Sequence, residues 1–133
     1  MGENYLIDTN VAIYFLNGVL PPQSLPFMRS IFDSGANLSV ITKIELLGWS
    51  FPGVSSSNSA EQFVDTSTIY ALTDAVVSLT IILRKAYKIK LPDAIIAATA
   101  IVYDLTLISR NDKDFVGIPS LAYRNPFSEP TEK

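Results

Sequence analysis

The acidic residues that could carry out chemistry are far apart in this chain but occupy similar places. Each stands just after a predicted strand or in the first turn of a predicted helix: Asp8, Glu45, Asp93, Asp112 and Asp114. Carboxylates gathered at one place repel one another and are costly to desolvate, and a divalent cation removes that cost. Two Mg²⁺ ions about 4 Å apart can activate a water and stabilise the leaving oxygen of a phosphodiester. These residue types therefore point to metal-dependent hydrolysis.

The composition supports the same chemistry by exclusion. The chain has no His and no Cys, which excludes imidazole acid–base catalysis, thiolate metal ligands and a cysteine nucleophile. Oxygen ligands favour hard cations such as Mg²⁺ or Mn²⁺. Since Mg²⁺ usually takes one or two protein carboxylates, four or five acids suffice for one or two ions.

The overall charge argues against a broad grip on nucleic acid. The net charge is −3 and the pI is about 4.8, so phosphates must be held by a local basic patch, by metal ions, or by both. Basic residues stand before Asp93 and beside the last acids: Arg84, Lys85, Lys88, Lys90, Arg110 and Lys113. They could contact RNA phosphates, or could simply form a solvated face.

Strand and helix patterns alternate along the chain. Strands are predicted at 5–7, 38–41, 68–72 and 106–109, with a weaker one at 121–123, and helices at 11–16, 23–33, 73–88 and 91–102 and from residue 42 on. This alternation predicts an α/β fold with a mainly parallel sheet flanked by helices. Ligands bind such sheets beyond the carboxyl ends of the strands, where the acids are expected to meet.

Each acid also has an ordinary explanation. Asp8 could cap a helix, Glu45 could close a capping box begun by Thr42, and Asp93 could complement a helix dipole. Asp112 and Asp114 lie in the polar turn RNDKD, where Asp is common. No one acid is persuasive alone, and the agreement of four placements carries the prediction.

Neighbouring polar residues could position a metal, a water or substrate. They are Thr9 and Asn10 beside Asp8, and Ser109, Arg110 and Asn111 beside the last acids. Ser109 suits positioning better than nucleophilic attack, because no base is evident near it.

The 133 residues suit one domain. We expect that domain to cover residues 1–126, followed by a polar tail over 127–133, with a surface loop at 51–60. The start MGENYLIDTN lacks a basic region followed by an apolar one, so no signal peptide and no membrane partner are expected, and a cytoplasmic location is predicted.

Four segments resemble one known family in order and spacing. YLIDTNVAIYFL resembles the opening of PIN-domain toxins of the VapC type, TKIELLGW their second motif, LPDAIIAATAIVYDLTLISRNDKDF their third and fourth, and IPSLAYRNP their last strand. Together they span nearly the whole chain, although the segment 51–66 fits the family least well.

The resemblance implies a three-layer α/β/α sandwich and an Mg²⁺- or Mn²⁺-dependent endoribonuclease, the toxin of a toxin–antitoxin pair. It also implies an RNA substrate, a cognate antitoxin and a homodimer. Asp8, Glu45 and Asp93 match the first three family acids, and Asp114 or Asp112 the fourth. The implied metal ligands are Asp8, Asp93 and Asp114, with Glu45 orienting the water.

Two rival functions remain open at this point. The first is a catalytically silent PIN fold that binds RNA or protein. The second is a phosphatase of the haloacid-dehalogenase kind with Asp8 as nucleophile. That family usually has a second Asp two residues later, where this chain has Asn10.

Overall fold

A single parallel sheet forms the centre of the molecule. A computed structural model describes residues 4–50 and 54–128, with the side chains of 54–57 left aside. The strands are β1 (Tyr5–Ile7), β2 (Asn37–Ser39), β3 (Thr68–Tyr70), β4 (Thr106–Ile108) and β5 (Tyr123–Arg124), and they pair in the order β3-β2-β1-β4-β5. Every pairing is parallel. The prediction of a mainly parallel sheet is confirmed.

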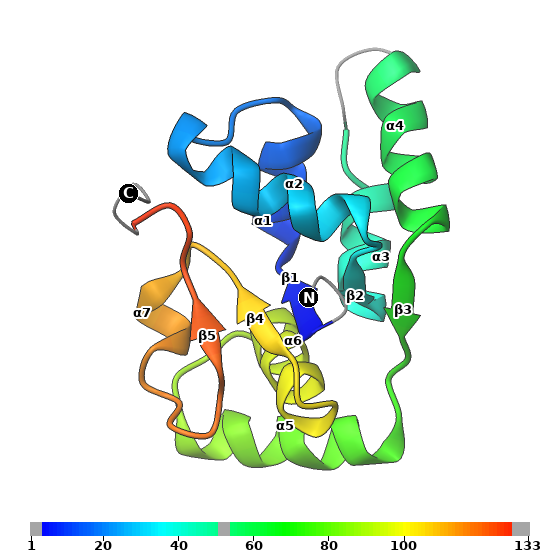
Figure 1. Ribbon diagram of the computed structural model, residues 1–133. Coiled ribbons are helices and arrows are strands. Elements are labelled where there is room, and N and C mark those ends of the chain that lie inside the picture. Colours follow the sequence, from blue (N-terminus) through cyan, green and yellow to red (C-terminus); the bar gives the residue numbers. More distant parts are fainter. Residues whose placement is uncertain (1–3, 51–53, 129–133) are drawn as a thin grey trace.

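Helices cover both faces of this sheet, as Figure 1 shows. They are α1 (Thr9–Leu16), α2 (Leu25–Asp33), α3 (Val40–Leu47), α4 (Val54–Asp65), α5 (Asp74–Ala86), α6 (Leu91–Val102) and the short α7 (Asp112–Phe115), with a 3₁₀ turn, η2 (Pro22–Ser24), before α2. None of the helices in the described part of the chain is both long enough and apolar enough to span a bilayer.

Alternation along the strands divides the core in two. Leu6 and Leu107 pack against the buried residues of α5 and α6, whereas Ile7 and Ile108 pack against those of α1, α2 and α4. Neighbouring residues of a strand point to opposite faces, so both faces of the sheet are buried. The α/β/α sandwich is confirmed.

Helix α6 has the longest buried run of the helices in the described part of the chain. All residues from Ala94 to Ala100 are buried, in keeping with the almost entirely apolar sequence of this helix. The small side chains of its alanines let α5 and the sheet approach closely. Because α6 is fixed on all sides, its first turn holds Asp93 in a defined place.

The predicted second strand ends early. Residues 38–41 were expected to be extended, but helix α3 starts at Val40, and the side chain of Ser39 accepts a hydrogen bond from Ile41 N at 3.1 Å. Ser39 is thus the N-cap, and the capping box of Thr42 and Glu45 is wrong. The cause is that two β-branched apolar residues, which resemble a strand by composition, lie half-buried in the first turn of a helix.

The predicted surface loop is wrong where the structure describes it. Residues 54–60 belong to helix α4, and 51–53 lie outside the described residues. Phe63 packs near Phe15 and Phe32, and Val64 is 3% exposed. Tertiary packing of this one face outweighs the weak helix propensity of the Ser-rich segment.

Candidate active site

Two hollows open at the carboxyl ends of β1 and β4. The larger, of about 390 Å³, is lined by Asp8, Thr9, Asn10, Ile13, Ile44, Glu45, Gly48, Trp49 and Asp93. These residues come from the end of β1 and from the N-terminal parts of α1 and α6, together with α3 and the residues just after it. The sheet edge chosen by the sequence argument is therefore the edge where acids from separate segments meet.

Asp8 forms the floor of both hollows and is 5% exposed. It is the N-cap of α1, and its Oδ1 accepts from Thr9 N at 2.9 Å. Its Oδ2 accepts from Ser109 Oγ at 2.8 Å. Burial raises the pKa of this carboxyl, and the two hydrogen bonds oppose that rise. Each oxygen accepts one hydrogen bond and keeps capacity for another contact.

Glu45 is tied to the start of α1 by a hydroxyl. Thr9 Oγ1 donates to Glu45 Oε1 at 2.6 Å and lies 3.0 Å from Thr42 Oγ1. One hydroxyl carries one proton, so Thr42 can donate to Thr9 while Thr9 donates to Glu45. These two hydrogen bonds fix the side chains of Thr42, Thr9 and Glu45 relative to one another, and the second oxygen of Glu45 makes no bond to Thr9.

The pKa of Asp93 depends on its burial and on the neighbouring acids. Its pKa is raised to about 7, first by burial, then by the charge of Asp8 and by a hydrogen bond with Asp114, with smaller effects from the charges of Asp114 and Glu45. A hydrogen bond between two carboxyl groups needs a proton on one of them. Below about pH 7 and without a cation, the site would thus hold a proton that a cation would displace.

Asp114 and Asp112, the two candidates for the fourth acid, point to different surroundings. Asp114 accepts from Asn111 Nδ2 at 2.8 Å and contributes to the raised pKa of both Asp8 and Asp93. The structure thus places Asp114 with the other acids.

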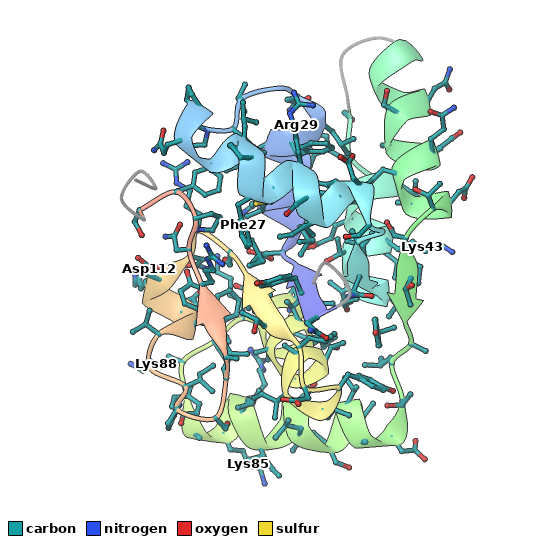
Figure 2. The ribbon with its side chains drawn as sticks, in the orientation of Figure 1. Phe27, Arg29, Lys43, Lys85, Lys88 and Asp112 are labelled. Atoms are coloured by element: carbon teal, nitrogen blue, oxygen red, sulfur yellow. The ribbon has the colours of Figure 1, made fainter. Side chains whose placement is uncertain are left out.

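Asp112 is bound to strand β5 instead. Its Oδ1 accepts from Tyr123 OH at 2.6 Å and from Asn125 Nδ2 at 3.0 Å, and these bonds lower its pKa. Tyr123 OH also lies 3.3 Å from the carbonyl oxygen of Ser109. Figure 2 shows Asp112 on the α7 side of the molecule. Asp112 connects α7 to β5 and lines neither hollow.

The donor set fits a hard divalent cation. Among the described residues, no three acidic side chains stand close enough together to surround one ion. Mg²⁺ needs only one or two carboxylates and fills its other positions with water. Asp8 and Asp93, whose pKa values are raised first by burial and then by neighbouring acids, meet that need. Asp114, which also acts on the pKa of both, is a further candidate.

The predicted positioning residues lie around Asp8. Asn10 lines both hollows, while Arg110 and Asn111 line the smaller. Ser109 is fully buried and donates to Asp8. Of the predicted basic residues, Lys85 in the last turn of α5 and Lys88 just after that helix are exposed, both labelled in Figure 2, and line neither hollow.

Sequence reasoning missed three contributors. Thr42 was assigned to a cap but supports Thr9. Tyr123 was assigned only to a weak strand, and its hydroxyl bonds depend on tertiary structure. Trp49 was not among the predicted site residues, yet it is 49% exposed and lines the larger hollow. Its place four residues after Glu45 was the available signal.

Comparison with known proteins agrees with this geometry. A model of the PIN domain family matches residues 60–120, a segment that runs from α4 through α7 and includes Asp93, Asp112 and Asp114. Among curated protein sequences, none matches this chain.

Solved structures match over nearly the whole chain. A toxin–antitoxin complex from Klebsiella pneumoniae contains a chain 28% identical to this one, covering 94% of this chain and 99% of its own, with a TM-score of 0.71. VapBC2 from Rickettsia felis, bound to a DNA fragment from its promoter, matches at 23% identity with a TM-score of 0.76, covering 91% of this chain and 97% of its own. DNA-bound VapBC from Salmonella typhimurium matches at 19% identity with a TM-score of 0.78, covering 92% of this chain and 98% of its own.

The sheet order, the acidic edge and these matches point in one direction. Residues 60–120 match the PIN-domain family model, and the chain as a whole shares the fold of the solved toxin–antitoxin structures. Both findings support the resemblance to PIN-domain toxins of the VapC type that the sequence showed.

Proposed function

We propose that this protein is an Mg²⁺- or Mn²⁺-dependent endoribonuclease and the toxin of a toxin–antitoxin pair. One observation carries the proposal: Asp8, Glu45, Asp93 and Asp114 come from four separate segments to a single sheet edge, where burial and the neighbouring acids raise the pKa of Asp8 and of Asp93. Clustered carboxylates repel one another and are costly to desolvate, and such clusters are common at sites that bind a cation and a phosphate ester.

The bound cation would lower the pKa of a water and neutralise charge on the phosphate. Asp8 and Asp93 would hold it, with Asp114 as the fourth acid. Asp8 is oriented by Ser109 and Thr9. Glu45, held at one oxygen by Thr9, would use its other oxygen to orient the attacking water. Asp112 stabilises the position of α7.

The protein partner is inferred from the similar solved structures and not from the acidic site. The Klebsiella structure is a toxin–antitoxin complex, and the Rickettsia and Salmonella structures are VapBC assemblies on DNA. We infer a cognate antitoxin for this chain, and a homodimer as in its family. RNA as the substrate likewise rests on the family.

A cleavage assay tests the proposal. The wild-type chain should cut single-stranded RNA with Mg²⁺ or Mn²⁺, stop with EDTA and recover on cation add-back. Asp8→Asn and Asp93→Asn should each lower the rate about 100-fold or more, since each removes a charge that holds the cation. Glu61→Gln, an exposed change on α4, should not.

The opposite results have clear meanings. Cleavage that survives in purified Asp93→Asn would refute the assigned chemistry. RNA or protein binding without cleavage under any cation would favour the silent PIN-fold module. Turnover of a simple phosphomonoester through Asp8 would favour the phosphatase.

A further inference from the structure

A second, smaller hollow adjoins the acidic one across Asp8. Its volume is about 210 Å³, and it is lined by Asp8, Asn10, Tyr14, Arg110 and Asn111. Asp8 and Asn10 line both hollows. A strand that placed one phosphate over the acids would therefore bring a neighbouring nucleotide to this hollow.

The guanidinium group of Arg110 is held in place by rings. Its central carbon lies 5.6 Å from the ring centroid of Tyr14 and 5.2 Å from that of Phe127. The two rings also contact each other at 5.7 Å between centroids. Stacking on aromatic faces restrains a long side chain while leaving its N–H donors free to bind.

The backbone beneath Arg110 is also fixed. Ser109 N donates to Arg124 O at 3.2 Å, and Asn111 N donates to Ser109 Oγ at 2.9 Å. Asp112 N donates to Arg110 O at 3.1 Å. The guanidinium group therefore extends from a rigid turn directly beside the floor of the acidic hollow.

The guanidinium group of Arg110 is available to an anion. Across residues 4–50 and 54–128, no carboxylate forms an ion pair or hydrogen bond with it, and the residue is exposed. This guanidinium group is restrained by two rings and lies next to the proposed phosphodiester site. It is therefore suited to form two parallel hydrogen bonds with a phosphate. Asn10 and Asn111 offer further amide donors at the same hollow.

We propose that this hollow binds the phosphate next to the scissile one in single-stranded RNA, with Arg110 as its main donor. The inference rests on the proposed function for its substrate class. Arg110 is here a substrate-positioning residue that acts on binding, whereas the acids act on the reaction.

Equilibrium binding tests this independently of cleavage. A fluorescent single-stranded RNA is titrated in Mg²⁺ into the Asp93→Asn chain, which is not expected to cut it, and into the same chain with Arg110→Met or Arg110→Lys. Methionine keeps the apolar stem against Tyr14 and Phe127 but removes the charge. The matched control is Arg29→Met, because Arg29 is exposed on α2 (Figure 2) and lines neither hollow.

Arg110→Met should weaken binding about tenfold, while Arg29→Met leaves it unchanged. The slope of log affinity against log salt should fall by about 0.7, as expected for one phosphate contact on a single strand. Arg110→Lys should keep the slope but recover only part of the affinity. A purely structural role for Arg110 would move the unfolding midpoint instead of the salt slope.

Steady-state cleavage by the otherwise wild-type chain separates the two proposals. Arg110→Met should raise KM about tenfold with little change in kcat. If the wild-type chain cuts RNA but binding, KM and salt slope are unchanged by Arg110→Met, the inference is wrong and the nuclease stands. If no RNA is cut yet the binding effects occur, the phosphate site stands and the nuclease fails. Undetectable RNA binding by the parent chain overturns the phosphate site.

Discussion

Asp8 combines two roles that the sequence presented as alternatives. It caps α1 through Thr9 N and also lies in the acidic cluster beside Asp93. The N-terminus of a helix offers N–H donors and a favourable dipole to an anion, so capping lowers the cost of burying this carboxylate. The ordinary explanation and the functional one are therefore compatible at this residue.

Replacing each candidate fourth acid by its amide should separate a charge requirement from an acceptor requirement. Asp114→Asn removes charge beside Asp93 and should lower kcat/KM about 100-fold. Asp112→Asn keeps an oxygen that Tyr123 and Asn125 can donate to, so it should have little effect. The measurement is steady-state cleavage, and the reverse order of the two variants would make Asp112 the fourth acid.

The pKa of Asp93 makes the cation-free protein sensitive to pH. That pKa is about 7 in the folded chain against 3.8 for the unperturbed group, so the folded chain binds the proton more tightly. The free energy of unfolding should therefore fall as pH rises from about 4 to about 7. Asp93→Asn cannot ionise, so it should lose this part of the slope.

Thermal unfolding in EDTA measures this effect. At pH 8, Asp93→Asn should melt roughly 3–6 °C above the wild-type chain, and near pH 4 the two should nearly coincide. The expected difference in melting temperature is small because Asp93 is only half-buried and water screens its charge. Equal melting temperatures at both pH values would show that the cluster does not strain Asp93.

Helix α3 shows how a cap decides where an element begins. Val40 and Ile41 look like strand residues, but Ser39, fully buried, ends β2 and starts α3. The capping bond could not be distinguished from the Thr42 pattern in the sequence, because both sites offer a hydroxyl before a helical run. Where α3 begins determines that Glu45 faces Thr9.

Removing this cap should destabilise the protein. Ser39→Ala deletes the acceptor for Ile41 N and should lower the free energy of unfolding by about 1 kcal/mol. Urea denaturation gives the value, with Ser78→Ala on the exposed face of α5 as control. A Ser39→Ala chain as stable as the control would show that Ser39 does not start the helix.

At the scale of the whole molecule, the rule that parallel strands bring their carboxyl ends to one edge was enough to group Asp8, Glu45 and Asp93. The spacing of apolar residues also predicted α5 and α6, and the alternation of strands and helices predicted a mainly parallel sheet flanked by helices, whereas the three-layer sandwich was implied by the family resemblance. Helix α4, the shifted β5 and the short α7 could not be predicted, because each depends on packing against distant segments rather than on local pattern. The same reason hid the Tyr123 bonds to Asp112.

The charge of the whole molecule limits how it can hold RNA. With a net charge of −3, long-range attraction to a polyanion is weak. Binding must therefore depend on a few fixed groups, of which the cation site and Arg110 lie side by side across Asp8.

The most direct test is to locate a cation in the acidic hollow. Crystals grown with Mn²⁺ should give an anomalous scattering peak at the carboxylates of Asp8 and Asp93, and the peak should vanish in Asp93→Asn crystals grown alike. Ordered carboxylates with no peak there, or a peak that survives the substitution, would contradict the proposed metal site.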